Sequence, residues 1–454
     1  MNICISDIRK KIEDTLRKKL DGRPLVVYGE AKIFELYTFA MPELFRQTSY
    51  FVSCSLSGSI NPNINVNHYT KEDVKLMPSK HFVIMMLRHD DESLRNEFKT
   101  LGFVEDEDYI DLISLEKCEN SSLQYGLEAL DSPVAFVHDP SYIPDSLREL
   151  YTANINTGNL VHWHAVKCSI PMRRFDASNC DDVKVLVSLG FICLSPTKLI
   201  TGNQRWLFKF GRYANILPLC LGIVCEKDAS PKDVSLSPEV YKLVCNLSNV
   251  CKLIGTRDEF TADILTKHGI RNVKPVGCPS LYYPYVAKRL VKIKRDNEPL
   301  RVVVNSATWT GTTELEKTWF DYISEKNLPY VCQSFRVSYK RINNPYLMSN
   351  RHIFTNISDW EKFVKKFNFS MGMRFHGNIV PIWNGIPSLF ITHDSRVSGM
   401  CKFFSLPHIE VEDFDPSKPL EYYYELADYD NFYKKMPKLV DEYKDFLRIN
   451  GIDI

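Results

Sequence analysis

The chain has 454 residues, of which 44% are hydrophobic, and its 57 basic residues are nearly balanced by 56 acidic ones. This length accommodates two to four domains, each with its own core, and the hydrophobic fraction is ordinary for a globular protein. The near-neutral balance disfavours a nucleic-acid partner, because binding to a phosphate backbone needs an excess of basic residues. Any anion-binding site must therefore be local.

Thirteen cysteines are scattered along the chain without a Cys-x-x-Cys pair. Their spacing favours neither a zinc ribbon nor a disulfide framework, so we expect buried thiols in a reducing compartment. No His-x-x-x-His or Asp-x-Asp spacing indicates a metal site, and we expect none. No run reaches the roughly 18 apolar residues of a membrane span, and no signal-peptide core precedes the first domain. We therefore expect a cytoplasmic protein without a transmembrane segment.

Residues 1–145 predict a first α/β domain. An apolar strand at 24–28 leads into a helix over 33–45, and a second strand at 82–87 leads into another helix. Strands that alternate with helices indicate a parallel, Rossmann-like sheet. The turn at Gly29 supplies only one of the three glycines of a dinucleotide-binding fingerprint, so we interpret this domain as structural and leave its role open.

Aspartate and proline residues between 130 and 150 predict a domain boundary, and residues 150–290 predict a second α/β unit. Short strands are expected at 252–256 and 273–276. Arg257 directly follows the first of these strands, where a ligand-binding residue is expected. A surface ion pair with a neighbouring acidic residue is the alternative interpretation of this arginine.

The second unit opens with an Asn- and Gly-rich loop at 154–159, followed by an apolar helix. Free backbone amides and a helix dipole at such a loop suit an anionic ligand, which makes Asn156, Gly158 and Asn159 candidate binding residues. Capping of an ordinary helix explains the same residues equally well. The loop alone does not decide between the two.

Residues 298–412 predict a third unit, in which strands at 300–305, 330–335 and 367–373 alternate with helices. The first strand is rich in β-branched residues, as in a buried parallel sheet. The pattern is again doubly wound. Residues 413–454 carry apolar side chains at helical spacing and predict a helical segment that packs back on the body of the protein.

The most informative stretch follows the last of these strands and runs Arg374-Phe375-His376-Gly377-Asn378. Ligands of open parallel sheets bind outside the carboxyl ends of the strands. Arg374 can bind a carboxylate or phosphate with two hydrogen bonds, and His376 can carry a proton near neutral pH. A capping or core histidine is the alternative for His376. The stretch predicts chemistry on a small anion.

Three segments within residues 150–412 resemble the polysaccharide pyruvyl transferase family. They are the block with Arg374, His376, the Gly-Ile-Pro turn and Asp394 at 359–407, the Arg-Asp helix start and Gly-Cys-Pro strand end at 254–279, and the Gly-Asn loop at 158–159. Cys278, Asn159 and Arg396 depart from the residues that are frequent at these positions in the family. The departures concern the placement of donor and acceptor more than the fold.

This resemblance implies an α/β fold similar to the GT-B glycosyltransferases, with a pair of Rossmann-like lobes that contain doubly wound parallel sheets. The N-terminal Rossmann-like domain would be an addition to that pair. The implied reaction transfers pyruvate from phosphoenolpyruvate to two hydroxyls of a sugar, forms a cyclic ketal and needs no cofactor. The acceptor would be a polysaccharide or its lipid-linked or nucleotide-linked precursor, which allows peripheral contact with a membrane-linked glycan precursor.

The resemblance also implies roles for individual residues. His376 and Arg374 would be catalytic, the histidine as acid and base and the arginine as the main anion ligand. The remaining candidates for substrate binding are Arg257, Arg396, Asn156, Gly158, Asn159, Gly377 and Asn378.

Two other functions remain compatible with the sequence. A GT-B glycosyltransferase that uses a nucleotide sugar would share the two-lobe fold and could bind a diphosphate with Arg374. A non-catalytic polysaccharide-assembly protein could use residues 1–145 as a docking domain. Convergence of Arg257, Arg374 and His376 in the folded protein would argue against this last interpretation.

Overall fold

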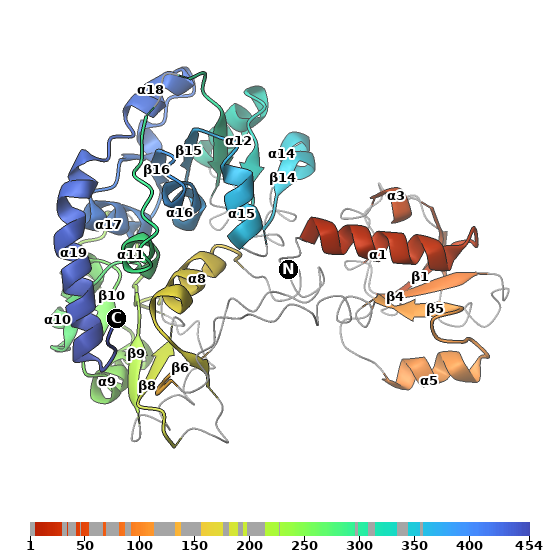
Figure 1. The fold of residues 1–454 in the computed structure, drawn as a ribbon, viewed down its shortest axis with the longest axis horizontal. Helices are drawn as coiled ribbons and strands as arrows, with labels where there is room; N and C mark the ends of the chain where they lie inside the picture. Colours follow the sequence, from red (N-terminus) through yellow and green to blue (C-terminus); the bar gives the residue numbers. More distant parts are fainter. Residues whose placement is uncertain are drawn as a thin grey trace. The chain divides into compact units, whose positions relative to one another are not determined.

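The structure, a computed structural model, divides the chain into two compact units (Figure 1). Residues 1–124 form most of the first unit, and residues 125–142, 156–333 and 337–454 form the second. The residues that the structure describes are 5–29, 34, 42–45, 47–53, 67–69, 81–86, 92–112, 132–137, 156–175, 181–188, 194–197, 214–226, 228–295, 298–306, 314–333, 344–354 and 357–454.

The first unit contains a five-stranded sheet in the order β3-β2-β1-β4-β5, and every strand pair is parallel. The predicted parallel α/β fold of this unit is therefore confirmed. Its strands are β1 (Leu25–Gly29), β2 (Thr48–Ser53), β3 (Asn67–Tyr69), β4 (Phe82–Met86) and β5 (Tyr109–Asp111), and its helices are α1 (Ile5–Leu20), α3 (Pro42–Phe45) and α5 (Glu92–Thr100). The helix expected over 33–45 is described only at Phe34 and in α3, and the rest of that range lies outside the described residues.

The second unit begins with a four-stranded parallel sheet in the order β7-β6-β8-β9, to which a β10-β11 pair is joined by a bridge between Leu221 and Thr256. Its elements are β6 (Val134–Val137), α8 (Asn159–Ser169), β7 (Arg173–Arg174), β8 (Val185–Ser188), β9 (Asn215–Pro218), α9 (Pro238–Val250), β10 (Ile254–Thr256), α10 (Glu259–Lys267), β11 (Val273–Pro275) and α11 (Pro279–Val286). β6 precedes the boundary that we expected near residue 145, yet it pairs with β8 in this sheet. Its partner is distant in sequence, so local turn residues could not reveal this pairing.

A six-stranded parallel sheet in the order β14-β13-β12-β15-β16-β17 forms the other part of the second unit. Its elements are β12 (Val302–Asn305), α12 (Glu314–Glu325), β13 (Tyr330–Val331), α14 (Pro345–Asn350), β14 (Arg351–His352), α15 (Ile357–Val364), β15 (Phe369–Gly372), α16 (Phe375–Trp383), β16 (Ser388–Thr392), α17 (Ser395–Phe404), β17 (His408–Glu410), a 3-10 turn (Val411–Asp413), α18 (Leu420–Glu425) and α19 (Asp430–Ile449). Every residue of β12, β15 and β16 is buried, as expected for central strands of a parallel sheet covered on both faces.

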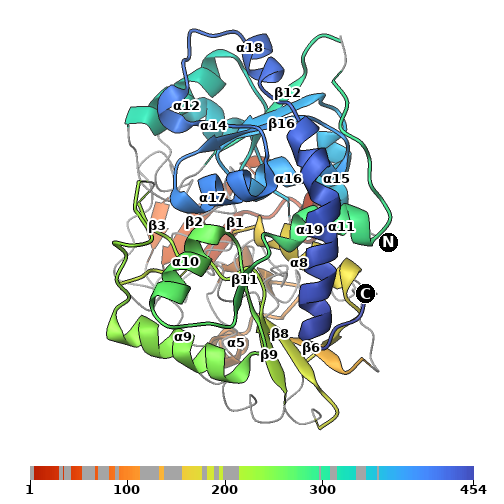
Figure 2. The same ribbon diagram turned by 90° about the vertical axis from the view of Figure 1, so that its left-hand side faces the viewer.

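Three helices pack between the two sheets of the second unit. Figure 2 shows α8, α11 and α16 between the six-stranded sheet and the β6-β8-β9 sheet, and α8 contacts both of the other helices. The indole Nε1 of Trp383 at the end of α16 donates a hydrogen bond of 2.8 Å to the carbonyl of Ser280 in α11. Two parallel sheets with helices between them form the predicted GT-B-like pair of lobes.

α19 returns from the six-stranded sheet to the four-stranded one (Figure 2). Tyr443 stacks on Tyr282 of α11 with ring centroids 4.2 Å apart. At the end of α19 the buried amide of Asn450 accepts hydrogen bonds from Leu253 N and Asn215 Nδ2 and donates one to the Leu253 carbonyl. These bonds attach the C-terminal helix to the loop before β10.

The described cysteines and helices bear on two further expectations. None of the eight described cysteines forms a disulfide, and five of them are buried. Among the described helices, none has both the length and the apolar composition that crossing a bilayer requires.

We predict that Asn450→Ala lowers the free energy of unfolding of the second unit by about 1–3 kcal/mol, because it leaves buried backbone groups of the loop before β10 without partners. The measurement is chemical denaturation followed by tryptophan fluorescence. Arg448→Ala is the matched control, since Arg448 pairs with Asp445 on the exposed side of the same helix, and it should change stability by less than about 0.5 kcal/mol. Equal effects of the two substitutions would contradict an anchoring role for Asn450.

Candidate functional site

A buried network of side-chain amides fixes the turn between β15 and α16. The Oδ1 atom of Asn305, at the end of β12, accepts a 2.7 Å hydrogen bond from the backbone amide of Arg374. The Nδ2 of Asn305 donates to Asn378 Oδ1, which also accepts from the hydroxyl of Ser370, and Asn378 Nδ2 donates to the Gly372 carbonyl. All of these groups are buried. The start of α16 therefore has one defined position relative to β12 and β15.

Arg374 is a buried cation at this turn. Its side chain is only 8% exposed, and its Nε donates a 3.3 Å hydrogen bond to the carbonyl of Ser306. Burial lowers the pKa of Arg374 to about 10, and the positive charge of Arg396 acts in the same direction. The guanidinium nevertheless stays protonated at neutral pH. A charge kept in a buried position is best stabilised by an anion at the same place.

Arg396 lies near Arg374 and is held by Asp394. One carboxylate oxygen of Asp394 caps α17 by accepting from the backbone amides of Arg396 and Val397, and the other accepts a 2.9 Å hydrogen bond from Arg396 Nε. Burial alone would raise the pKa of Asp394, but Arg396 and His393 outweigh burial and hold this pKa well below its usual range. Most of the charge of Arg396 is therefore balanced within the protein.

Arg257 lies at the end of β10 on the opposite sheet of the same unit. Its side chain is 5% exposed, which excludes the surface ion pair considered from the sequence. The next residue, Asp258, caps α10 by accepting a 2.7 Å hydrogen bond from the backbone amide of Thr261. Burial raises the pKa of Asp258, while Arg257 opposes the rise. Gly399 of α17 packs directly against Asp258, because a Cβ atom at Gly399 would lie 2.8 Å from its Oδ2.

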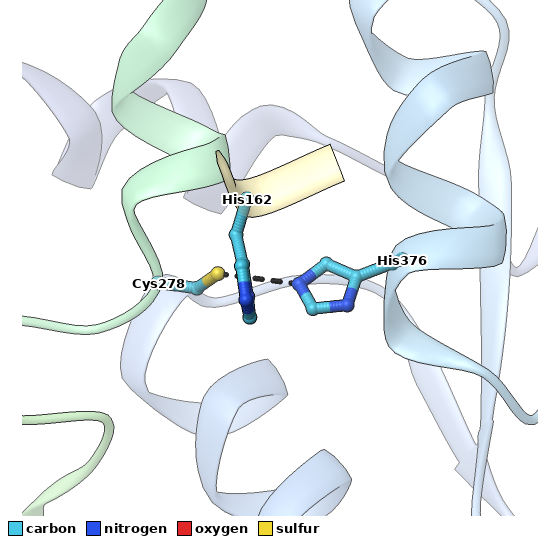
Figure 3. A group of neighbouring side chains, drawn as sticks. All are labelled: His162, Cys278 and His376. Atoms are coloured by element: carbon cyan, nitrogen blue, oxygen red, sulfur yellow. Dashed lines mark hydrogen bonds between the residues drawn. The ribbon is translucent and has the colours of Figure 1, made fainter. Parts of the chain in front are cut away.

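A cluster of one cysteine and two histidines lies at the junction of α8, α11 and α16. Figure 3 shows His162, Cys278 and His376 pointing toward one another from these three elements. Cys278 Sγ is 3.4 Å from His376 Nε2, and the ring of His162 stands perpendicular to that of His376 with centroids 4.8 Å apart. His162 and Cys278 are buried, whereas His376 is partly exposed. His376 is therefore the member that a substrate can reach.

The ionisation of this cluster follows from its burial. Burial lowers the pKa of His162 to about 4, so its imidazole is neutral at neutral pH. For Cys278, burial acts to raise the pKa, but hydrogen bonds with Cys220, His162 and His376 outweigh it and hold the pKa well below its usual range. The hydrogen bond with Cys278, followed by burial, raises the pKa of Cys220 well above its usual range. Cys278 thus carries the more acidic thiol of the pair.

The loop before α8 meets the other lobe at Gln333. Asn156 Oδ1 accepts a 3.1 Å hydrogen bond from Gly158 N, and its carbonyl accepts one of 2.9 Å from Asn159 N. A Cβ atom at either Gly158 or Gly377 would clash with the side-chain amide of Gln333. This amide therefore lies against the first turns of both α8 and α16. Gln333 is 2% exposed, and among the described residues its Nε2 has no hydrogen-bond partner.

The predicted site residues thus fall into two groups. Arg257, Arg374, Arg396 and His376 belong to one connected set of buried or partly buried groups, since Arg257 and His376 both influence the pKa of His162 and Arg396 influences that of Arg374. Gly158 and Gly377 allow close approach to Gln333, while Asn156, Asn159 and Asn378 make hydrogen bonds within their own turns or to neighbouring strands.

Sequence reasoning did not select His162, Cys278 or Gln333 as site residues. Cys278 and His376 are 98 positions apart, and the two histidines come from different lobes. No local spacing links these three residues. The one available signal was the position of Cys278 at the end of a predicted strand, a place where ligand-binding residues gather.

Comparison with known structures yields only distant similarities. The S. aureus MnaA-UDP co-structure shares 10% identity over 94% of this chain and 91% of that chain, with a TM-score of 0.30. The Methanocaldococcus jannaschii UDP-GlcNAc 2-epimerase in complex with UDP-GlcNAc and UDP shares 9% over 89% and 92%, with a TM-score of 0.32. The wall teichoic acid polymerase TagF shares 10% over 80% and 92%, also with a TM-score of 0.32. Similarities at this level carry no argument about chemistry.

Comparison at the level of families is more informative. No curated protein matches the chain. The family described as polysaccharide pyruvyl transferase matches residues 120–395, which is more than half of the chain and includes Arg257, Arg374 and His376. The chain therefore belongs to the polysaccharide pyruvyl transferase family, a family of polysaccharide-modifying transferases.

Proposed function

We propose that the protein transfers pyruvate from phosphoenolpyruvate to two hydroxyls of a sugar, in a polysaccharide or its lipid-linked or nucleotide-linked precursor. The product is a cyclic pyruvate ketal. One observation carries the proposal: a buried, protonated Arg374 lies two positions before the partly exposed His376 at the start of α16, in a chain of this family.

The charges around Arg374 favour a small polyanion. The connected set holds three guanidinium groups but only two carboxylates, Asp258 and Asp394, and burial raises the pKa of Asp258. Phosphoenolpyruvate carries both a carboxylate and a phosphate, and an arginine can hold either group with two parallel hydrogen bonds. We assign Arg374 as the main ligand of these groups, with Arg257 and Arg396 in secondary roles.

Backbone groups add to this preference. The first turns of α8 and α16 meet at Gln333, and helix N-termini attract anions through their free amides and dipoles. The buried Nε2 of Gln333 is a further donor at the same place. Arginine side chains together with these neutral donors match the several oxygen atoms of a phosphoenol acid.

The chemistry requires a group that both gives and takes protons. A proton is added to the methylene carbon of phosphoenolpyruvate, and the adjacent carbon becomes cationic and is attacked by the first hydroxyl, which loses its proton. The bond from that carbon to the phosphate oxygen then breaks, inorganic phosphate leaves, and the second hydroxyl attacks and loses its proton. His376 is placed to donate the first proton and accept the second, and Arg374 offsets the charge of the departing phosphate.

The structure bears on the alternatives unequally. Burial of Arg257, Arg374 and His376 in one connected set supports a chemical role over a purely structural one. A nucleotide-sugar glycosyltransferase would also use Arg374, and binding experiments separate it from the present proposal.

We predict that His376→Ala and Arg374→Ala each lower the rate of phosphate release from phosphoenolpyruvate in the presence of the acceptor by about 10²–10⁴-fold. Release is measured together with the mass gain of candidate lipid-linked or nucleotide-activated sugars. His408→Ala is the control, because the ring of His408 bonds to the Leu406 carbonyl in β17, away from the site. Full transfer by both site variants, with native circular dichroism, would falsify the assignment.

We also predict that phosphoenolpyruvate raises the Tm of the protein, because a ligand that binds only the folded state at 100 times its Kd adds about 2.7 kcal/mol to stability. The shift should disappear in Arg374→Gln and shrink in Arg257→Gln. Pyruvate and inorganic phosphate, tested separately, show whether both charged groups are needed. A shift caused by uridine nucleotides and not by phosphoenolpyruvate would instead support a glycosyltransferase.

A further inference from the structure

The cluster of His162, Cys278 and His376 has a property that pyruvate transfer does not require. Each residue offers one of the atoms that bind transition metals in proteins, a thiol sulfur or an imidazole nitrogen. These three atoms all lie within 4.8 Å of one another. We propose that His162, Cys278 and His376 form a binding site for a zinc ion.

The separations fit tetrahedral coordination. Zinc binds sulfur at about 2.3 Å and imidazole nitrogen at about 2.0–2.1 Å, so a sulfur and a nitrogen on one tetrahedral ion are separated by about 3.5 Å. The observed distance from Cys278 Sγ to His376 Nε2 is 3.4 Å. The widest separation in the cluster exceeds the tetrahedral value by only about 1 Å, which small side-chain rotations can remove.

The environment of His162 supports the same conclusion. Its side chain is completely buried, and neither ring nitrogen has a hydrogen-bond partner among the described residues. A buried polar group without a partner costs about 1–3 kcal/mol. A metal ion bound by one nitrogen would satisfy that atom, and the ring already faces the other two ligands (Figure 3).

The three ligands come from elements that pack firmly against one another. His162 lies in α8, Cys278 immediately precedes α11, and His376 lies in the first turn of α16. The bond from Trp383 to Ser280 joins two of these helices, and the amide of Gln333 lies against the first turns of α8 and α16. The ligand atoms are therefore brought together by the fold and not by a flexible loop.

The ligand set selects the class of metal. One sulfur and two imidazoles favour zinc over magnesium or calcium, which prefer oxygen ligands. Three protein ligands leave a fourth position for water or an anion. Sequence spacing gave no reason to expect a metal here, because spacing rules detect only ligands that are close in the chain.

A consequence follows if His376 has the acid and base role proposed above. A zinc ion on Nε2 occupies the lone pair that would accept a proton. Zinc would then hold the transferase inactive, and removal of zinc would restore transfer. This consequence rests on the proposed function, whereas the metal site itself does not.

The test uses the full-length protein, reduced and stripped of metal with a chelator, and cobalt(II) as the probe. One equivalent of cobalt should produce a thiolate-to-cobalt charge-transfer band and intense visible bands of tetrahedral coordination, and one equivalent of zinc should abolish both. Cys278→Ser should lose the charge-transfer band. His162→Gln should weaken binding by more than about 100-fold, since loss of a direct ligand exceeds the effect of an outer contact.

A second histidine and cysteine pair supplies matched controls. His164 and Cys168, on the same helix α8, lie 3.5 Å apart, but the His164 ring also bonds to the Tyr283 hydroxyl and the pair belongs to no three-residue group within the described residues. His164→Gln and Cys168→Ser should retain the cobalt spectrum. X-ray absorption of the zinc-loaded wild-type protein should find one sulfur and two imidazole nitrogens, a measurement independent of how the variants fold.

The proposal is overturned if one equivalent of cobalt gives no charge-transfer band in the wild-type protein, since the contact between Cys278 and His376 is then only a hydrogen bond. It is equally overturned if Cys278→Ser keeps the band, or if absorption finds oxygen ligands alone. Failure of pyruvate transfer leaves these spectra unaffected, so the two proposals fail separately.

Discussion

The paired side-chain amides of Asn305 and Asn378 are the constraint on which the candidate site depends. They connect β12, β15 and the first turn of α16, and each of their polar atoms has a partner in that network. Buried amides are costly when unpaired, so this complete network favours one arrangement of the turn over its alternatives. Because the network holds the backbone amide of Arg374, it sets where that guanidinium and the neighbouring imidazole of His376 begin. A catalytic arginine and histidine need such a fixed starting position.

Small residues let the other lobe approach this turn. Gly158 and Gly377 both pack against Gln333, and Gly399 packs against Asp258, at contacts where a Cβ atom would clash. Larger side chains at these positions would separate α8, α10, α16 and α17. The ends of β10 and β15 could then no longer present Arg257 and Arg374 to one connected site. Close packing of helix ends thus turns two separate strand ends into a single cluster of charges.

The sequence predicted those features that depend on local pattern. The strand before Arg374 and the placement of Arg374 and His376 beyond its end follow from apolar runs and from the rule that ligands bind at strand ends. The membership of β6 in the second unit and the approach of His162 to Cys278 depend instead on pairing and packing between distant segments. No local signal reports such contacts. A resemblance to a family supplied the two-lobe arrangement, but not the residues that meet at its centre.

Burial has opposite consequences for the two halves of the site. It lowers the pKa of Arg374 to about 10 and that of His162 to about 4. The arginine starts so far above neutrality that it remains a cation, whereas the histidine starts near neutrality and becomes a neutral ligand. One low-dielectric environment therefore creates a permanently positive half that can hold an anion and, beside it, a neutral nitrogen and sulfur half. His376, partly exposed between the two, is the group through which events in one half reach the other.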